Sequence, residues 1–495
     1  MQINWLAICA EAIIGYLDEI YDNEGMVRKF QDITESAFIV AESVEASENH
    51  EDKKQAAILY SSGLGLLLQE TFQYRLALQA YQKALSIKNK YDEQNCFVEH
   101  FNIAKMLNEL EDFDGAIKYN TLCIRERQRN YGKHDISLID FYIEIASCYS
   151  QQNDYFKAIH NCLTCIDILA NCDNSVDGYY VYVFEIYVSL AEIYFFYGDY
   201  KESARYSVMA LKVCSTSFEK DDYYYLARCR VYFRIAQIYT SIDDDSRALR
   251  WINKELEAYI RFDNSFSGIA EQKSRAYDLM GAVHIKQGKF DRAIECYLLV
   301  QNIQKDLYSE KSPEAALALN NIGYVYGEME DWEKAFSKYD AALDILTQCF
   351  GNNHTDTMLI YYNMAHDYCT RKDYQQSVSL LNKVIDYFSD KCGGYNSNLA
   401  DAYLNMARTL RHSARVDESL EYYKKALSIQ KRIFYTYHPD IGLTYKCIAD
   451  TLFESKNNDA TWFYLQAKNV YEKALGKNSY RVVEINKKIA LCEGV

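Results

Sequence analysis

Small and aromatic residues recur along this chain at fixed offsets, and the pattern predicts paired helices. Ten small residues are expected in the first helix of each pair: Gly65, Ala104, Ala146, Ala191, Ala236, Gly281, Gly323, Ala365, Ala407 and Ala449. Nine residues after each of the first nine comes a mostly aromatic position: Tyr74, Phe113, Tyr155, Tyr200, Asp245, Phe290, Trp332, Tyr374 and Val416. Three residues later a second small residue follows: Ala77, Ala116, Ala158, Ser203, Ala248, Ala293, Ala335, Ser377 and Ser419. Since small side chains at regular steps let two helices approach closely, each unit is predicted to be a helical hairpin.

The period of the pattern predicts that the hairpins stack into an array. The aromatic positions from Tyr74 to Val416 advance by 39, 42, 45, 45, 45, 42, 42 and 42 residues. A repeat of this size indicates stacking, because one hairpin cannot bury its apolar face alone. Since the nine-residue offset inside each unit never changes, the extra length must lie at the outer ends of the helices or in the connections between hairpins, and we expect longer helices.

Several runs resemble the tetratricopeptide repeat. The run Asp331-Trp332-Glu333-Lys334-Ala335 is similar to the start of the second helix of that repeat, and Asn321-Ile322-Gly323 fits its first helix. The segment Tyr437-His438-Pro439-Asp440 resembles the kinesin-light-chain subclass. The resemblance covers about residues 51–476. It implies an all-α, right-handed superhelical solenoid of about ten antiparallel helix-turn-helix repeats with terminal capping helices.

The ends of the chain depart from the repeat pattern. We interpret residues 1–50 as an N-terminal helical cap or degenerate repeat, 51–476 as the array, and 477–495 as a C-terminal capping helix. Near the end the pattern slips, and a short insertion around 456–459 is the simplest account. Two prolines and nineteen glycines among 495 residues leave few helix breakers, which favours nearly continuous helix.

Charge and targeting signals narrow the classes of partner. The net charge is −16, and no run of Lys and Arg spans the array, so nucleic acid is not expected as the main partner and membrane binding is disfavoured. No Lys or Arg precedes Arg28, which argues against a secretory signal, and no long apolar run predicts membrane insertion. Fifteen cysteines, an odd number, then indicate free thiols in a reducing compartment, and we expect a cytoplasmic protein.

No catalytic motif was found, and the chain is predicted not to be an enzyme. The strongest metal candidate is a group with a CxxC spacing: His160, Cys162, Cys165 and Cys172. However, Cys162 and Cys165 occupy positions that hold Tyr81 and Ala84 in the first repeat and face the partner helix. Buried packing is therefore the favoured interpretation, and no metal or cofactor is expected.

The resemblance implies that first helices line a concave groove, which makes their polar positions the candidate binding residues. The position two residues before each small residue points into that groove and holds Asn102, Glu144, Ser189, Arg234, Leu279, Asn321, Asn363 and Asn405. The last three could offer amides to the backbone of an extended peptide, or they could contact the neighbouring hairpin. Beside them, an aromatic and polar groove wall is expected from Tyr324, Tyr362, His366 and Arg408.

Three arginines are expected to form a positive site in the fifth and sixth repeats. Arg230 and Arg234 are four residues apart on one helix face, and Arg275 takes the position of Arg230 in the next repeat. Such a site could hold an acidic segment or a terminal carboxylate by forked hydrogen bonds. Alternatively, the arginines neutralise neighbours such as Glu185 and Asp278. The similarity to carboxylate-clamp repeats is partial.

Together these features predict a protein–protein interaction scaffold or adaptor that binds a peptide segment of a partner protein in the concave groove. The alternative is a regulatory sensor subunit whose solenoid changes shape when a peptide or partner binds, and which controls a separate effector protein. A scaffold should bind with little change of shape, whereas a sensor should change its compactness.

Overall fold

The computed structural model describes residues 41, 45, 56–70, 74–90, 96–173, 175–176, 178–260, 267–308, 310–390 and 394–494. These residues form α-helices and connecting turns, with one π-helical segment, and the described part contains no strand. The chain divides into two compact units, 1–151 with 156–176, and 152–155 with 177–495. The division falls inside the range predicted for the array.

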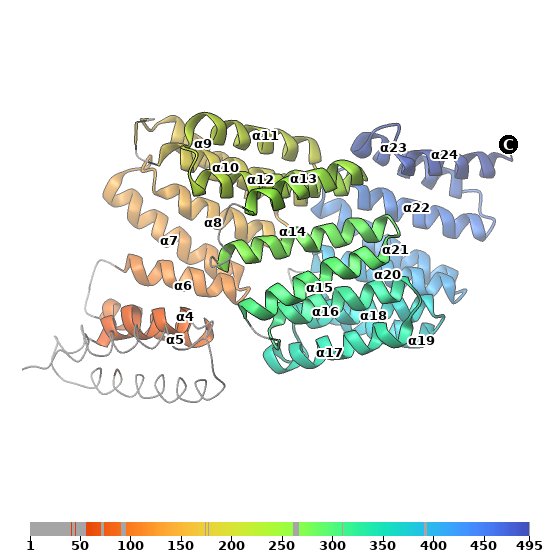
Figure 1. Ribbon diagram of the computed structural model, residues 1–495, viewed down its shortest axis with the longest axis horizontal. Helices are drawn as coiled ribbons and strands as arrows, with labels where there is room; N and C mark the ends of the chain where they lie inside the picture. Colours follow the sequence, from red (N-terminus) through yellow and green to blue (C-terminus); the bar gives the residue numbers. More distant parts are fainter. Residues whose placement is uncertain are drawn as a thin grey trace, which may run out of the picture. The chain divides into compact units, whose positions relative to one another are not determined.

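The helices alternate between first and second members of successive hairpins. In the first half of the chain they are η2 (Leu59–Gly65), α4 (Leu66–Glu70), α5 (Tyr74–Lys90), α6 (Phe97–Glu109), α7 (Phe113–Tyr131), α8 (Leu138–Gln151), α9 (Tyr155–Ala170), α10 (Tyr179–Tyr197), α11 (Tyr200–Ser217), α12 (Asp222–Ser241) and α13 (Asp245–Tyr259). They continue as α14 (Ser267–Lys286), α15 (Phe290–Leu307), α16 (Pro313–Glu328), α17 (Trp332–Phe350), α18 (Thr355–Thr370), α19 (Tyr374–Ser389), α20 (Ser397–His412), α21 (Val416–Ile433), α22 (Pro439–Glu454), α23 (Ala460–Leu475) and α24 (Tyr480–Glu493). Figure 1 shows the hairpins of the second unit following one another in chain order.

The predicted aromatic positions mark the starts of the second helices. Each of the nine, from Tyr74 to Val416, is the first residue of a second helix. Two residues before eight of these starts the backbone has positive φ, as at Glu330 (59°) and Gly198 (91°). Asp331 then caps its helix by accepting a hydrogen bond from the N–H of Lys334. A constant turn therefore explains the constant offset.

The first helices absorb the variation in repeat length, as predicted. Where the aromatic positions are 45 residues apart, the intervening first helices α10, α12 and α14 have 19, 20 and 20 residues. Where the spacing is 42, α16, α18 and α20 have 16 residues each. The central repeats therefore present longer first helices than the repeats that follow them.

The small residues bring the two helices of a hairpin into close contact. All nine second-helix small residues are fully buried. Where that residue is serine, its hydroxyl donates to the carbonyl of the first-helix small residue, as from Ser377 to Ala365 at 2.8 Å and from Ser419 to Ala407 at 2.7 Å. A Cβ atom added to Gly323 would lie 2.8 Å from the Tyr339 ring. The spacing of these helices leaves no room for larger side chains.

In the second unit, the first helices form a layer of their own. Consecutive helices pack as hairpins, and each first helix also contacts the next one in the pairs α10·α12, α12·α14, α16·α18, α18·α20 and α20·α22. Polar residues on this layer therefore meet equivalent residues of neighbouring repeats. We call its solvent-facing side the first-helix face. The right-handed twist of the solenoid stays a prediction.

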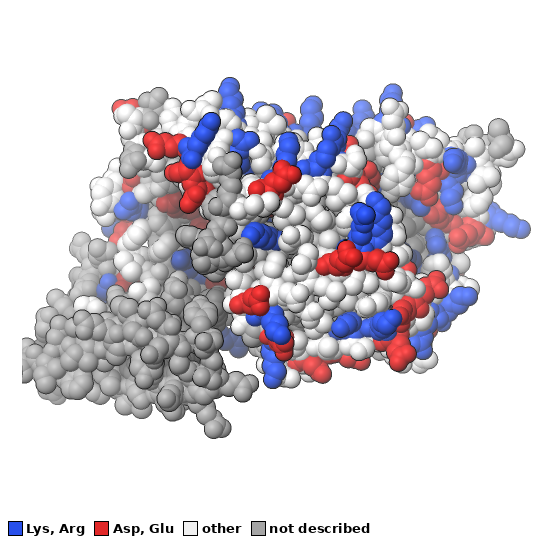
Figure 2. Space-filling view, in the orientation of Figure 1, with Lys and Arg blue, Asp and Glu red and all other residues white. Residues whose placement is uncertain are grey.

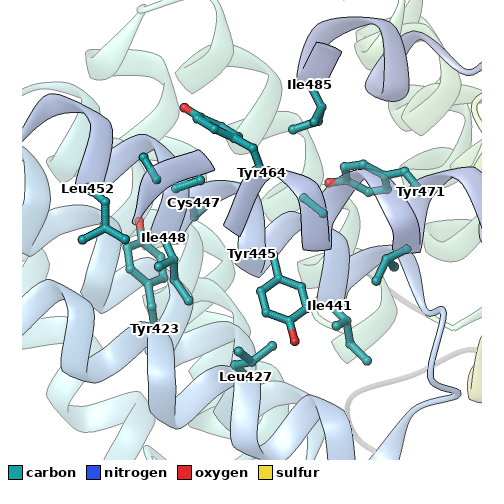
Figure 3. Close-up of a cluster of buried hydrophobic side chains, with 14 of the residues drawn as sticks. Tyr423, Leu427, Ile441, Tyr445, Cys447, Ile448, Leu452, Tyr464, Tyr471 and Ile485 are labelled. Carbon is teal, nitrogen blue, oxygen red and sulfur yellow. The ribbon is translucent and has the colours of Figure 1, made fainter. Parts of the chain in front are cut away.

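The last repeats share a large buried cluster. Tyr423 of α21, Tyr445 of α22 and Tyr464 of α23 point into one core, with Ile485 of α24 closing it (Figure 3). Aromatic rings bury much surface each, which explains how tyrosine-rich hairpins stabilise one another. The tyrosines in these positions thus serve packing.

The structure describes the C-terminal predicted cap but little of the N-terminal one. The proposed cap over 1–50 lies outside the described residues, except for Ala41 and Glu45, and α24 lies within 477–495. The two-residue slip after Lys456 lengthens the turn between α22 and α23. Among the described helices, none is long and apolar enough to cross a membrane.

Candidate functional site

Three neighbouring first helices place charged residues at one level of the first-helix face. Glu185 of α10, Arg230 of α12 and Arg275 of α14 each lie six residues before the small residue of their repeat. Because α10 contacts α12 and α12 contacts α14, residues in this shared position become neighbours. The structure therefore brings together residues that are 45 positions apart in the sequence.

Arg230 is fully engaged with a carboxylate of the preceding repeat. Its Nη1 lies 2.6 Å from Glu185 Oε1, and its Nη2 donates to Glu185 Oε2 at 2.9 Å. This forked geometry uses both carboxylate oxygens, which is the strongest arrangement of such a pair. The predicted alternative, that Glu185 neutralises an arginine, is confirmed for Arg230.

Arg234 is different, because its guanidinium is buried and only partly paired. The residue is 8% exposed, and its Nη2 lies 3.1 Å from Glu192 Oε1. Its Nη1 is buried without a hydrogen-bond partner among the described residues. Burial, reinforced by the like charge of Arg275, lowers the pKa of Arg234 from its ordinary value, although Glu192 opposes this shift. An unpaired N–H donor in such a place costs free energy until an acceptor reaches it.

Aromatic rings and Arg275 complete the surroundings of this guanidinium. The Arg234 Cζ atom lies 4.9 Å from the Phe195 ring centroid, and Arg275 stacks on Phe233 at 4.8 Å. Arg230, Arg234 and Arg275 all line a pocket of about 160 Å³. We call it the arginine pocket, and its other walls are Val188, Ala191, Glu192, Ser207, Val231, Phe233 and Gln272.

The asparagines of the later repeats are bonded to one another and to their neighbours. Asn321 Nδ2 donates to Asp278 Oδ1 at 2.7 Å, and Asn363 Nδ2 donates to Asn320 Oδ1 at 3.0 Å. Asn405 is buried, and its Oδ1 accepts from Arg408 at 3.4 Å. The contacts of Asn321 and Asn363 match the alternative in which the amides link adjacent hairpins, whereas the contact of Asn405 stays within α20. A peptide would have to compete with them.

The residues predicted for the groove wall lie on the consecutive first helices α16, α18 and α20. The rings of Tyr324 and His366 lie 6.2 Å apart, and His366 Nε2 lies 3.6 Å from Glu328 Oε1. The neighbouring His366 imidazole lowers the pKa of Glu328 from its ordinary value. Tyr324, His366 and Glu328 are therefore close neighbours.

A half-buried carboxyl group, that of Asp401, was not predicted from the sequence. Asp401 of α20 lies six residues before Ala407, so it holds the position that Glu185 and Arg275 hold earlier. Burial, together with the like charge of Asp440, raises its pKa to about 8. The repeat position was a usable signal, since the residue six before the small residue is charged in five first helices: Asp140, Glu185, Arg230, Arg275 and Asp401.

The partners of the arginines and asparagines were only partly visible in the sequence. Glu192 and Phe195 were not singled out, although Glu192 follows the small residue Ala191 as His366 follows Ala365. Asp278 was named only as a possible partner of the arginines, and the structure pairs it with Asn321. The position of a residue within its repeat predicts whether it lies on the layer of first helices. The direction of its side chain then decides which partner it contacts.

The cysteine group lies in packing positions. Cys162 and Cys165 are buried and free, and Cys165 Sγ donates to the Ile139 carbonyl at 3.8 Å. Burial raises the pKa of Cys162 to about 12, which disfavours the thiolate that binds metals. Among the residues that the structure describes, no three His, Cys, Asp or Glu side chains gather as a metal site.

Surface charge is mixed on the face that Figure 2 shows. Lysine and arginine side chains there lie among aspartates and glutamates, and the described part of that face has no continuous basic stripe. The arginine pocket thus contrasts with a surface on which charges of both signs alternate.

Comparison with known proteins identifies the repeat. A family model described as tetratricopeptide repeat matches residues 272–348, 314–390 and 398–475, and no curated protein sequence matches the chain. Among solved structures, the chain is similar to the apo form of the quorum sensor NprR from B. thuringiensis, at 15% identity over 72% of this chain and 96% of that one, with TM-score 0.48. A Rap protein complexed with Competence and Sporulation Factor has 14% identity over 77% and 99%, with TM-score 0.48. A Podosopora anserina putative kinesin light chain with TPR-like repeats has 16% identity over 40% of this chain and 95% of that one, with TM-score 0.33. The family matches place tetratricopeptide repeats between residues 272 and 475 of this chain.

Proposed function

We propose that this chain is an interaction scaffold or adaptor, and that its first-helix face binds a peptide segment of a partner protein through an acidic group held in the arginine pocket. The observation that carries this proposal is the buried, unpaired Nη1 of Arg234 beside two further arginines. A carboxylate is the natural acceptor for a guanidinium, because two parallel N–H donors match its two oxygens. Repeat scaffolds commonly present such extended binding surfaces.

The test uses labelled pools of random octapeptides and the whole chain. One pool carries a carboxylate, and a matched pool carries none, with its C-terminus amidated. Fluorescence anisotropy should show tighter binding of the acidic pool to the wild-type chain. Arg275→Gln should weaken that binding at least about threefold, since it removes a charged donor from the pocket. Equal binding of both pools would overturn the proposal.

Arg250→Gln supplies the matched control. Arg250 is an exposed arginine on the second helix α13 and does not line the arginine pocket. Its replacement changes the net charge by the same amount as Arg275→Gln. If both variants weaken binding equally, the effect comes from the overall field of the protein and not from the pocket.

A second candidate function, a regulatory sensor, is favoured by contacts between distant repeats of the second unit. Arg481 of α24 pairs with Asp243, before α13, through Nε–Oδ2 at 2.8 Å and Nη2–Oδ1 at 3.0 Å. The Tyr435 N–H donates to the Tyr197 carbonyl at 2.9 Å. In a simple solenoid each repeat contacts only its neighbours. A ligand that altered the spacing of the repeats would change these additional contacts.

X-ray scattering separates the two candidates. A scaffold should keep its radius of gyration when the acidic pool is added, whereas a sensor should change it. Arg481→Gln should change the radius of gyration in the sensor case by releasing Asp243. Arg415→Gln, which removes only a pair with Glu418 three residues away, should leave it unchanged.

A further inference from the structure

Glu192 lies where an incoming carboxylate would be expected to bind. Its Oε1 is 3.1 Å from Arg234 Nη2, while Nη1 of the same guanidinium has no partner among the described residues. The Glu192 side chain is 47% exposed, so the carboxylate reaches the buried cation from the solvent side. Glu192 therefore contacts Arg234 through one oxygen only, and the second terminal nitrogen of the guanidinium is left without an acceptor in the described part of the chain.

The pocket cannot hold Glu192 and a ligand carboxylate on the same guanidinium without repulsion. A ligand bound only to Nη1 would lie beside the Glu192 carboxylate, and like charges a few ångströms apart repel each other. A ligand that binds both Nη1 and Nη2 must displace Glu192 altogether. Either geometry places Glu192 in competition with the ligand.

We propose that Glu192 is an internal competitor, which occupies the ligand's place on Arg234 in the unbound chain and exchanges with a single carboxylate when a peptide binds. This inference rests on the proposed function. The carboxylate belongs to an acidic side chain or to the end of the peptide chain. The three arginines facing Glu185 and Glu192 leave one net positive charge, which suits one carboxylate better than a run of acids.

Glu185 is not the group that exchanges. Both of its oxygens bind Arg230, at 2.6 Å and 2.9 Å, whereas Glu192 makes one contact at 3.1 Å. The exposed Glu192 carboxylate gains full hydration when it leaves, so its release costs little. The Arg234 guanidinium stays in place, because it stacks on Phe195 and Phe196 at 4.9 Å and 5.4 Å. The Arg234 guanidinium is therefore held in place, while the carboxylate bound to it can exchange.

The test compares Glu192→Gln with Glu257→Gln in the whole chain. Glu257 is an exposed glutamate on α13, so its replacement changes the net charge equally without touching the pocket. Three labelled octapeptide pools serve as probes: one without carboxylates, one with a free C-terminus only, and one amidated with a single internal Glu. Melting curves check that both variants fold.

Glu192→Gln should tighten binding of a carboxylate pool about three- to tenfold and leave the uncharged pool unchanged, while Glu257→Gln changes neither. The pool that responds identifies the source of the carboxylate. If the wild type prefers the carboxylate pools but Glu192→Gln does not tighten them, the competitor is refuted and the proposed function stands. If the wild type shows no preference for any carboxylate pool, the proposed function fails and this inference fails with it.

Discussion

Adding one methyl group at Gly323 tests whether close helix contact holds the hairpins together. In Gly323→Ala the new Cβ would lie 2.8 Å from Tyr339 Cε1 and 3.2 Å from the Ala335 carbonyl oxygen. Carbon atoms ordinarily meet at about 3.5–4.0 Å. The ring cannot move aside easily, since Tyr339 is fully buried and its hydroxyl donates to Asp367 on α18 at 2.9 Å. The helices α16 and α17 must therefore separate.

The magnitude follows from two opposing effects. Alanine in a helix interior is more favourable than glycine by about 0.8–1 kcal/mol. Overpacking a close contact costs about 1–3 kcal/mol. The variant should thus be destabilised by up to about 2 kcal/mol. Gly268→Ala in α14 is the matched control, because its Cβ would meet nothing within 4 Å and it should be neutral or slightly stabilising.

Hydrogen exchange is the suitable assay, because repeat arrays do not always unfold as one unit. The amides of α16 and α17 should lose protection relative to the Gly268→Ala chain, by up to about 30-fold for a loss of about 2 kcal/mol. Unchanged protection in α16 and α17 would refute the reasoning. It would mean that this hairpin widens freely to the spacing at which Ala407 and Tyr423 already occupy the same two positions.

Three further predictions concern buried polar groups. Ser377→Ala should lower the free energy of unfolding, measured with denaturant, by about 1 kcal/mol or less, because other hairpins carry alanine at this position. A loss above about 2 kcal/mol would show that the hydrogen bonds of Ser377 to Ala365 and Thr409 contribute more than this. Burial raises the pKa of Asp367 to about 7 in the folded chain, whereas the carboxyl of an unfolded chain titrates near about 4. The free energy of unfolding of the wild type should therefore fall as pH rises between these two values. Asp367→Asn should flatten this pH dependence. Persistence of that slope in the variant would assign it to another group. Asn405→Ala should lower the free energy of unfolding by about 1–2 kcal/mol, because Asn405 is 4% exposed and accepts a hydrogen bond from Arg408. An unchanged melting curve together with lost peptide binding would instead show that Asn405 contacts the peptide.

The hairpins could be predicted from sequence because their determinants are local. Gly323, Trp332 and Ala335 lie within thirteen residues of each other, and a turn with one positive-φ residue fixes their offset. The constant turn also restricts the extra length of a repeat to the outer ends of its helices or to the connections between hairpins. Steric limits on close approach leave few alternatives at these positions.

The site could be predicted only in part, because its contacts join residues of different repeats. Register placed Arg230, Arg234 and Arg275 on one face, and the structure brings them to one pocket. The sequence could not show that Arg230 is fully paired while Arg234 keeps an unpaired nitrogen. That distinction depends on side-chain rotamers and burial, which residue spacing does not encode. The asparagines were likewise placed on the right layer without their partners.

The same geometry suggests how one fold accommodates different partners. The small and aromatic positions are nearly invariant from repeat to repeat, since they set the distance between helices. The position six residues before each small residue is not constrained in this way, and it holds Glu185, Arg230, Arg275, Leu317, Leu359 and Asp401 in successive repeats from α10 to α20. Its chemistry changes from paired ions through apolar residues to a half-buried acid, while the backbone that carries it repeats. A substitution there should therefore alter which peptide group is accepted at a given repeat and leave the stacking of hairpins intact, which is the separation of roles that a peptide-binding array requires.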